Sequence, residues 1–152
     1  MARSLDVPLP EAEYLARLGH LVYLVSYLEG LVLSDLPALA GNIPDGLTAV
    51  QLSEQTTGGI GKLLSAWAKH VPDPAIRAYL DSGGAALSKV APKRNATLHS
   101  RPTSDEHGRS RLYRWRASQE FFIDEEWLDS QIAFVTQKIS EVDEKRAAVF
   151  GY

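Results

Sequence analysis

Apolar residues recur along the chain at intervals of three and four positions, which is the pattern of amphipathic helices. The clearest run follows two prolines near the start, and it predicts a helix from Glu11 to Leu36. Its apolar positions share one face: Leu18, Leu21, Val25, Leu28 and Val32. The most apolar part is interrupted by three polar residues, so we interpret it as a buried helix and not as a membrane span. These residues are Ser26, Glu29 and Asp35.

Two further helical regions follow a loop that is marked by prolines and glycines at 37–46. The second region is predicted over residues 47–71, weakened at Gly58 and Gly59 and strongest over residues 60–67. The third begins after Asp73, a good N-cap, with Pro74 in the first turn, where proline is tolerated. It continues past Leu87, and its glycine pair at 83–84 and a proline at 92 are places where it can bend.

The last third of the chain changes pattern before it returns to helix. Residues 100–108 have a loop composition, and residues 112–115 and 121–123 are predicted as two short strands of a hairpin. Asp124 is expected to cap a final helix with Glu125 and Glu126 in its first turn, at the positive end of the helix dipole. We therefore predict a single, mainly α domain over residues 1–152. It is a four- to five-helix bundle with a small β-hairpin or loop insertion before the last helix.

Composition excludes several classes of site. The chain has no cysteine, so it has no disulfide and no thiolate-bound zinc or iron–sulfur site, and this is compatible with a reducing cytosol. No export signal is visible, and we expect a cytoplasmic protein that does not act at a membrane. The run at residues 58–62 lacks the first glycine and the final Ser or Thr of a phosphate-binding loop. No metal-ligand pattern occurs, and we expect neither a metal nor another cofactor.

Positive charge is concentrated in one segment of an otherwise acidic chain. The net charge is −3, yet residues 89–116 hold half of all the Lys and Arg against only Asp105 and Glu106. Such a segment is either an ordinary solvated surface or a surface that meets a polyanion such as RNA. If it binds RNA, the expected contact residues are Lys93, Arg101, Arg109, Arg111, Tyr113, Arg114 and Arg116. Tyr113 and Trp115 either stack on unpaired bases or pack the hairpin against the last helix.

The same segment carries an arginine followed five residues later by a histidine, Arg94 and His99. In a helix, Asn95 and His99 share a face, so the amide can orient the imidazole. Arg94 lies about 140° around the axis but has a long side chain. His99 can move a proton near neutral pH and Arg94 can stabilise a phosphate, which are the tools of metal-free RNA cleavage. The alternative is a plain helix end with a surface histidine.

The order of elements and this motif resemble the HEPN superfamily of helical domains. Its signature is an arginine, usually a polar residue, three to five further residues and a histidine, and Arg94, Asn95 and His99 fit it. The resemblance implies a composite, metal-independent ribonuclease site in a homodimer. Some toxin members carry a tyrosine two positions after the histidine, which marks neutralisation by nucleotidyltransferase antitoxins, and this chain has Arg101 there.

We therefore predict an endoribonuclease with Arg94, Asn95 and His99 at its catalytic site. The homodimer would bring the motif-bearing helix close to its symmetry mate. One alternative is a non-catalytic HEPN-like module that binds RNA or a partner protein such as an antitoxin, in a toxin–antitoxin or phage-defence system. Another is a helical scaffold whose basic segment contacts some other anion.

Overall fold

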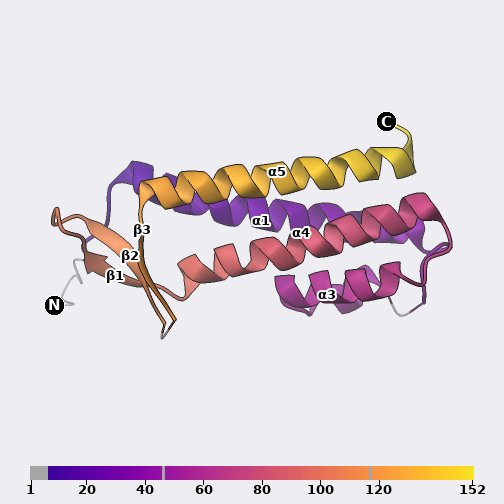
Figure 1. Ribbon diagram of the computed structural model, residues 1–152, viewed down its shortest axis with the longest axis horizontal. Helices are drawn as coiled ribbons and strands as arrows, with labels where there is room; N and C mark the ends of the chain where they lie inside the picture. The colour runs from indigo at the N-terminus through magenta and orange to yellow at the C-terminus, as the bar shows by residue number, and fades with distance from the viewer. Residues whose placement is uncertain (1–6, 46, 117) are drawn as a thin grey trace, which may run out of the picture.

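A computed structural model describes residues 7–45, 47–116 and 118–152 of the chain. The described part contains five helices and one three-stranded antiparallel sheet. The long helices α1, α4 and α5 run alongside one another, α3 packs on α4, and the sheet lies at one end of the bundle (Figure 1). The predicted mainly α class, with a small β element before the last helix, is confirmed. The elements are α1 (Ala12–Leu39), α2 (Ala49–Ser53), α3 (Thr57–Ala68), α4 (Pro74–Leu98), β1 (Arg101–Ser104), β2 (Ser110–Arg116), β3 (Gln119–Ile123) and α5 (Glu125–Phe150).

Local capping signals set the starts of α4 and α5 as predicted. The Asp73 carboxylate accepts hydrogen bonds from two backbone N–H groups of the first turn of α4. The Asp124 carboxylate accepts one from the Trp127 N–H in α5. Each aspartate satisfies donors that have no partner inside the helix, which fixes where the helix begins. α4 continues through its glycine pair and through Pro92 as one helix.

Three predictions of local structure need correction. The first helix extends to Leu39 and includes Pro37 in its last turn. The single helical region expected over residues 47–71 is two helices, because Thr48 caps α2 and Thr56 caps α3 by accepting a hydrogen bond from the Gly59 N–H. The loop expected over residues 100–108 contains β1, which pairs with β2. The hairpin of β2 and β3 is confirmed, with strands longer than predicted.

The contact between α3 and α4 depends on two glycines. A Cβ placed on Gly61 would lie 2.7 Å from the Gly84 carbonyl oxygen, and a Cβ on Gly84 would lie 2.7 Å from the Gly61 carbonyl oxygen. These distances are shorter than van der Waals contact with backbone atoms that cannot move independently. The two helices therefore approach closely because neither carries a side chain at the crossing.

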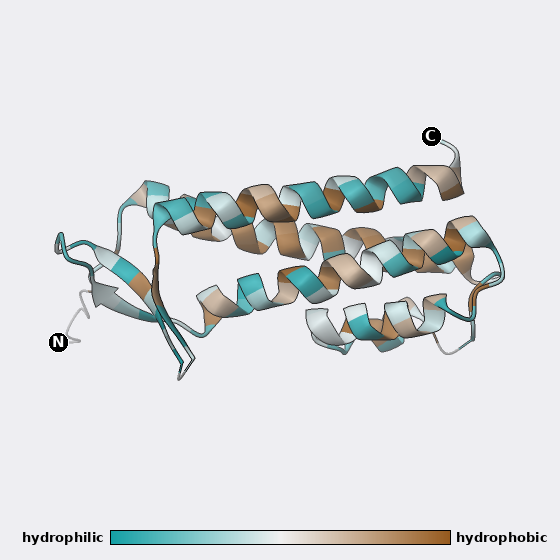
Figure 2. Ribbon diagram, in the orientation of Figure 1, coloured by the Kyte–Doolittle hydropathy of each residue, from teal (hydrophilic) through white to brown (hydrophobic). Residues whose placement is uncertain are grey.

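The core lies between α1, α3, α4 and α5, which all carry apolar residues along their length (Figure 2). The Tyr14 hydroxyl ties α1 to the sheet, since it donates to the Ile123 carbonyl oxygen at 2.6 Å and accepts from the Leu112 N–H at 3.0 Å. At the opposite end of α1, buried Asp35 accepts hydrogen bonds from Tyr79 of α4 and Arg146 of α5. Polar contacts thus link α1 to the sheet at one end and to both other long helices at the other.

Candidate functional site

The Arg94–His99 motif lies at the C-terminal end of α4, next to the sheet. α4 ends at Leu98, and His99 is its C-cap with φ −106° and ψ 17°. The His99 N–H donates to the Asn95 carbonyl oxygen at 3.0 Å, so the backbone keeps helical pairing up to the histidine. The His99 side chain is exposed, and β1 begins two residues later at Arg101.

Within one chain, Arg94 and His99 occupy different sides of α4. Five residues of helix separate them by about 140° around the axis. Arg94 is half-buried, and its Nε is buried with no hydrogen-bond partner in the described part of the chain. Asn95 lies one turn before His99 on the same face, and no side-chain hydrogen bond joins the two among the described residues. A phosphate at His99 is reached by Arg94 only if the arginine swings around the helix end.

The sheet next to His99 presents a row of basic and aromatic side chains. Pairing across the three strands aligns Arg101 with Tyr113 and Tyr113 with Phe122. Because side chains alternate along a strand, this row lies on the face opposite to Leu112 and the fully buried Ile123. The rings of Tyr113 and Phe122 are 4.9 Å apart between centroids.

Trp115 extends this row and is 61% exposed. The Arg101 guanidinium lies 5.8 Å from the centre of its ring. The Tyr113 hydroxyl donates to Glu120 at 3.3 Å, and burial together with this negative charge raises the pKa of Tyr113. We call Arg101, Tyr113, Trp115 and Phe122 the aromatic sheet face. Phe122 was predicted only as a strand residue, and its spacing in the hairpin was the signal that could have placed it here.

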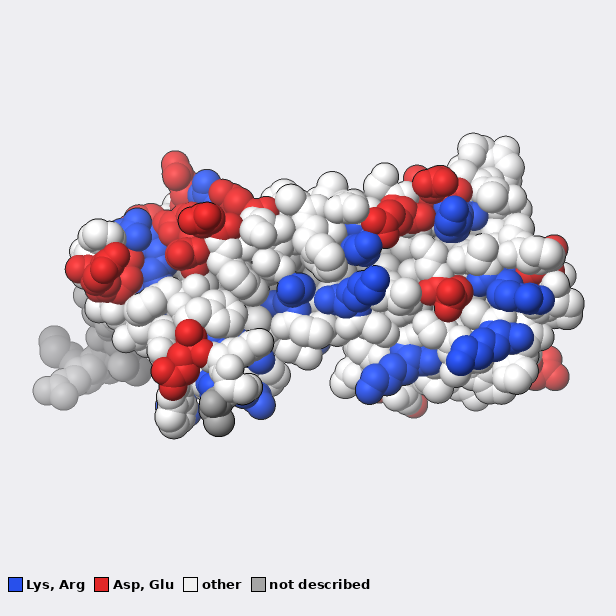
Figure 3. All heavy atoms as spheres, viewed as in Figure 1, with Lys and Arg blue, Asp and Glu red and all other residues white. Residues whose placement is uncertain are grey.

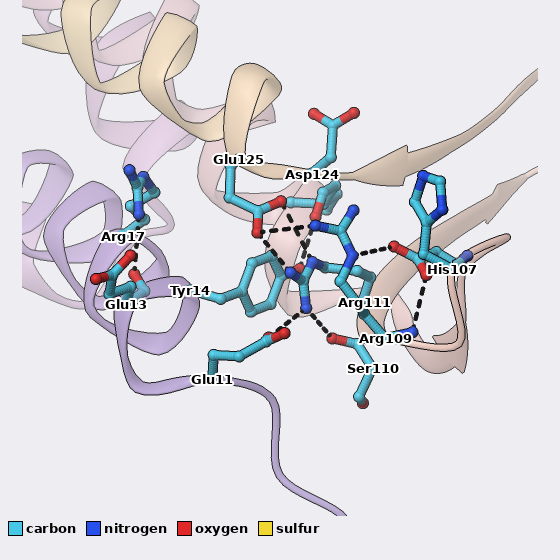
Figure 4. A network of polar contacts seen from close by, with 12 residues as sticks. Glu11, Glu13, Tyr14, Arg17, His107, Arg109, Ser110, Arg111, Asp124 and Glu125 are labelled. Atoms are coloured by element: carbon cyan, nitrogen blue, oxygen red, sulfur yellow. Dashed lines mark hydrogen bonds and ion pairs between the residues drawn. The ribbon is translucent and has the colours of Figure 1, made fainter.

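Arg111 has a structural role in place of the RNA contact predicted from the sequence. Its side chain is 2% exposed, it lies over the ring of Tyr14, and its guanidinium pairs with Glu11 and Glu125 (Figure 4). The hydrogen bonds from Arg111 hold the pKa values of both glutamates below their usual range. The two carboxylates occupy this guanidinium, so we exclude Arg111 from the proposed RNA surface.

Arg109 is also paired within the chain. Its Nε donates to Asp105 at 2.9 Å, and a second nitrogen lies 3.9 Å from Glu125 (Figure 4). Burial opposes ionisation of Asp105, but hydrogen bonds from Arg109 and His107 outweigh it and keep the pKa of that carboxyl low. This ion pair offsets most of the positive charge that Arg109 would offer to a phosphate.

Lys93 and Arg114 line a groove of about 630 Å³ between α4, the hairpin and the start of α5. Arg114 is half-buried, and its Nη1 has no hydrogen-bond partner in the described residues. Lys93 lies over the ring of Phe134. Glu120 and Asp124 line the same groove, so its two positive charges face two negative ones. Of the remaining predicted contacts, Arg116 is exposed at the end of β2.

The basic segment therefore does not fold into one continuous positive patch. On the face shown in Figure 3, the basic side chains lie scattered over α3, α4, α5 and the sheet, and acidic side chains gather near the start of α5. The arginines available for a ligand at the sheet are Arg101 and Arg116, joined by Arg114 in the groove. No group of three or more metal-ligating side chains occurs among the residues that the structure describes.

Comparison with family models, with curated proteins and with solved structures found no match for this chain. The resemblance to HEPN domains therefore depends on the motif and on the order of elements.

Proposed function

We propose that the protein binds single-stranded RNA on the aromatic sheet face and cleaves it at the end of α4. The observation that carries this proposal is the aromatic sheet face itself, which begins two residues after His99. Aromatic rings stack on unpaired bases of any sequence, and a neighbouring arginine supplies charge for the phosphates. RNA held there by Arg101 and Trp115 has its backbone close to an exposed histidine.

In the proposed reaction, the His99 imidazole accepts the proton of a ribose 2′-hydroxyl. The 2′-oxygen attacks the adjacent phosphorus and the bond from phosphorus to the 5′-oxygen breaks. One product then ends in a 2′,3′-cyclic phosphate, and the other begins with a 5′-hydroxyl after its oxygen takes up a proton. Arg94 stabilises the negative charge that develops on the phosphate, and Asn95 orients the imidazole. A second copy of His99 would supply the acid if two chains met at this end.

A non-catalytic RNA-binding module is the second candidate. It is favoured by the separation of Arg94 and His99 around α4 and by the buried position of the Arg94 Nε. In this case the aromatic sheet face binds RNA, and the motif residues only end the helix.

Cleavage of a labelled single-stranded RNA, in the presence of EDTA, separates the two candidates. We expect the wild type to produce 2′,3′-cyclic phosphate ends and His99→Ala to lose this activity while both proteins bind RNA equally. His107→Ala is the matched control, because His107 is an exposed histidine outside the motif, and it should keep wild-type activity. Binding without cleavage by the wild type would select the second candidate. Absence of RNA binding would refute both.

A further inference from the structure

The outer face of α1 carries no charged residue over nearly its whole length. Residues on the side opposite the core are exposed: Ala12, Ala16, Gly19, Tyr23, Ser26, Tyr27, Gly30 and Ser34, with exposed His20 at the edge of this face. Tyr23 is 67% exposed and Tyr27 48%. Among the described helices, α1 is the one whose length and composition would allow it to cross a membrane, and only 33% of its most apolar window is buried.

The charged residues of α1 lie on its other sides or at its start. Arg17 pairs with Asp129 of α5, Glu29 accepts a hydrogen bond from Thr57, and Asp35 is held in the interior. Glu13 lies in the first turn. By contrast, α5 has a similar length and many charged residues facing solvent. A solvated helix face normally carries charge, so the outer face of α1 has the composition of a contact surface.

No contact among the described residues requires the two glycines on this face. Gly19 and Gly30 have negative φ angles, and a Cβ on either would meet nothing within 4 Å. Each destabilises the helix relative to alanine, because glycine loses more conformational freedom when it becomes helical. Gly61 and Gly84 show what glycine does elsewhere in this fold, because they permit two helices to meet. By the same reasoning, Gly19 and Gly30 would let a helix from outside the chain approach α1.

We propose that the outer faces of two α1 helices pack antiparallel in a homodimer. Exposed small and aromatic residues follow a heptad spacing at positions 12, 16, 19, 23, 26 and 30. A two-fold axis between residues 24 and 25 sets Gly19 of one chain against Gly30 of the other, and Tyr23 against Ser26. Large residues then meet small ones, and the surface complements its own copy. A neutral face offers nothing to a charged partner such as RNA or an acidic membrane.

The size of the face suits a dimer. α1 has 28 residues, which at 1.5 Å each makes a helix of about 42 Å. If half of a 10 Å wide cylinder is covered, each copy buries about 650 Å², and the pair buries about 1,300 Å². This lies inside the range of stable specific interfaces, which begins near 1,200 Å².

This inference goes beyond the proposed function and does not depend on it. An antiparallel pair of α1 helices places the two sheets and the two His99 residues at opposite ends of the dimer, because α4 ends where α1 begins (Figure 1). The composite site that the motif implies would need the two α4 ends to meet. RNA cleavage and this dimer are therefore tested separately.

Sedimentation tests the interface with the full chain. We expect a dimer at micromolar concentration, and Gly30→Glu should raise its dissociation constant by about 100-fold or more, because two charges would be buried without partners. The variant should fold, since the position is open. Ser130→Glu, on the exposed side of α5, is the matched control and should remain dimeric. A monomeric wild type, or a dimer that Gly30→Glu leaves intact, would overturn the proposal. Binding of the monomer to neutral phosphatidylcholine vesicles would also overturn it, in favour of a lipid surface.

Spin labels test the arrangement, because the chain has no cysteine to compete with an introduced one. For His20→Cys the two labelled positions should be offset by about 14 Å along the helices, and for Ala38→Cys by about 40 Å. Equal distances at the two positions would indicate parallel helices and would contradict the antiparallel dimer.

Discussion

Replacing Arg111 by methionine tests whether this arginine holds the fold together or binds a ligand. Methionine keeps an unbranched apolar stem but removes the charge. The change removes hydrogen bonds to Glu11 and Glu125 and the contact with the Tyr14 ring. A charge-assisted hydrogen bond contributes about 1.5–3 kcal/mol and a cation–π contact about 0.5–1 kcal/mol.

The net loss for Arg111→Met is smaller than the sum of those contributions. The Glu11 and Glu125 side chains are 56% and 31% exposed, so both carboxylates regain water when the arginine is removed. Burial of the guanidinium, which costs free energy, is also relieved. We expect a net loss of about 2 kcal/mol. In a domain of this size, that lowers Tm by about 4–8 °C.

The dependence of this stability loss on pH shows whether the ion pairs with Glu11 and Glu125 cause it. Arg111 lowers the folded-state pKa of Glu11 and Glu125 from their usual value of 4.5. This stabilisation is therefore fully present above pH 4.5 and is lost as the pH falls through the lower folded pKa values. The difference in Tm between wild type and Arg111→Met should be largest at neutral pH and should shrink in acid.

Thermal unfolding followed by circular dichroism measures both effects. Arg109→Met is the matched control, because Arg109 pairs at the surface and should cost less than about 1 kcal/mol. RNA affinity measured well below Tm should be unchanged in Arg111→Met. If Arg111→Met kept the wild-type Tm and lost RNA binding, Arg111 would be a ligand contact and the structural role would be wrong.

Further substitutions test the packing, the proposed RNA surface and the buried polar contacts. Gly84→Ala should destabilise the fold by about 3 kcal/mol in chemical denaturation, because its Cβ would meet the Gly61 backbone. Gly19→Ala is the control: the monomer of this variant should be at least as stable as the wild-type monomer, because a Cβ there meets nothing within 4 Å. Trp115→Ala should weaken binding of single-stranded RNA, measured by fluorescence anisotropy, by roughly 5- to 150-fold and should change duplex binding little; equal losses for both RNAs would contradict stacking. Burial and Asp35 raise the pKa of Tyr79, so the wild type should lose stability as pH rises above 10, the usual tyrosine value, and Tyr79→Phe should reduce that loss.

The sequence predicted the helical architecture where the signals are local. The carboxylates of Asp73 and Asp124 accept hydrogen bonds from the first turn of α4 and of α5, which sets where each helix begins. Both starts were predicted correctly. β1 was missed because its residues carry no alternating pattern and all are exposed. Its strand conformation comes from pairing with β2, and such pairing depends on the rest of the fold.

The candidate site was predicted as a set of residue types, without their partners. Arg101 and Arg111 look alike in the sequence, since both are arginines in the same basic segment. The structure separates them because Glu11, 100 positions away, and Glu125 pair with Arg111, whereas Arg101 faces solvent. Burial and long-range ion pairs cannot be inferred from local composition, so the sequence overestimated the number of free positive charges.

Alternation along the strands gives the reason for regarding the aromatic sheet face as a binding surface. One side of the hairpin packs against the helix bundle, since Leu112 and Ile123 lie against the core. The Leu112 N–H and the Ile123 carbonyl oxygen also form hydrogen bonds with the Tyr14 hydroxyl. That contact fixes the register, and the register turns Tyr113 and Phe122 to the other side. Arg111 lies on this same side of β2, but there Glu11, Glu125 and the Tyr14 ring cover it. Farther along the strand, Tyr113 is half-buried and Trp115 is exposed. Exposed Trp115, with Arg101 beside its ring, does not pack against the core of the described chain, and this is why we propose that the two side chains bind a ligand with flat rings and negative charge.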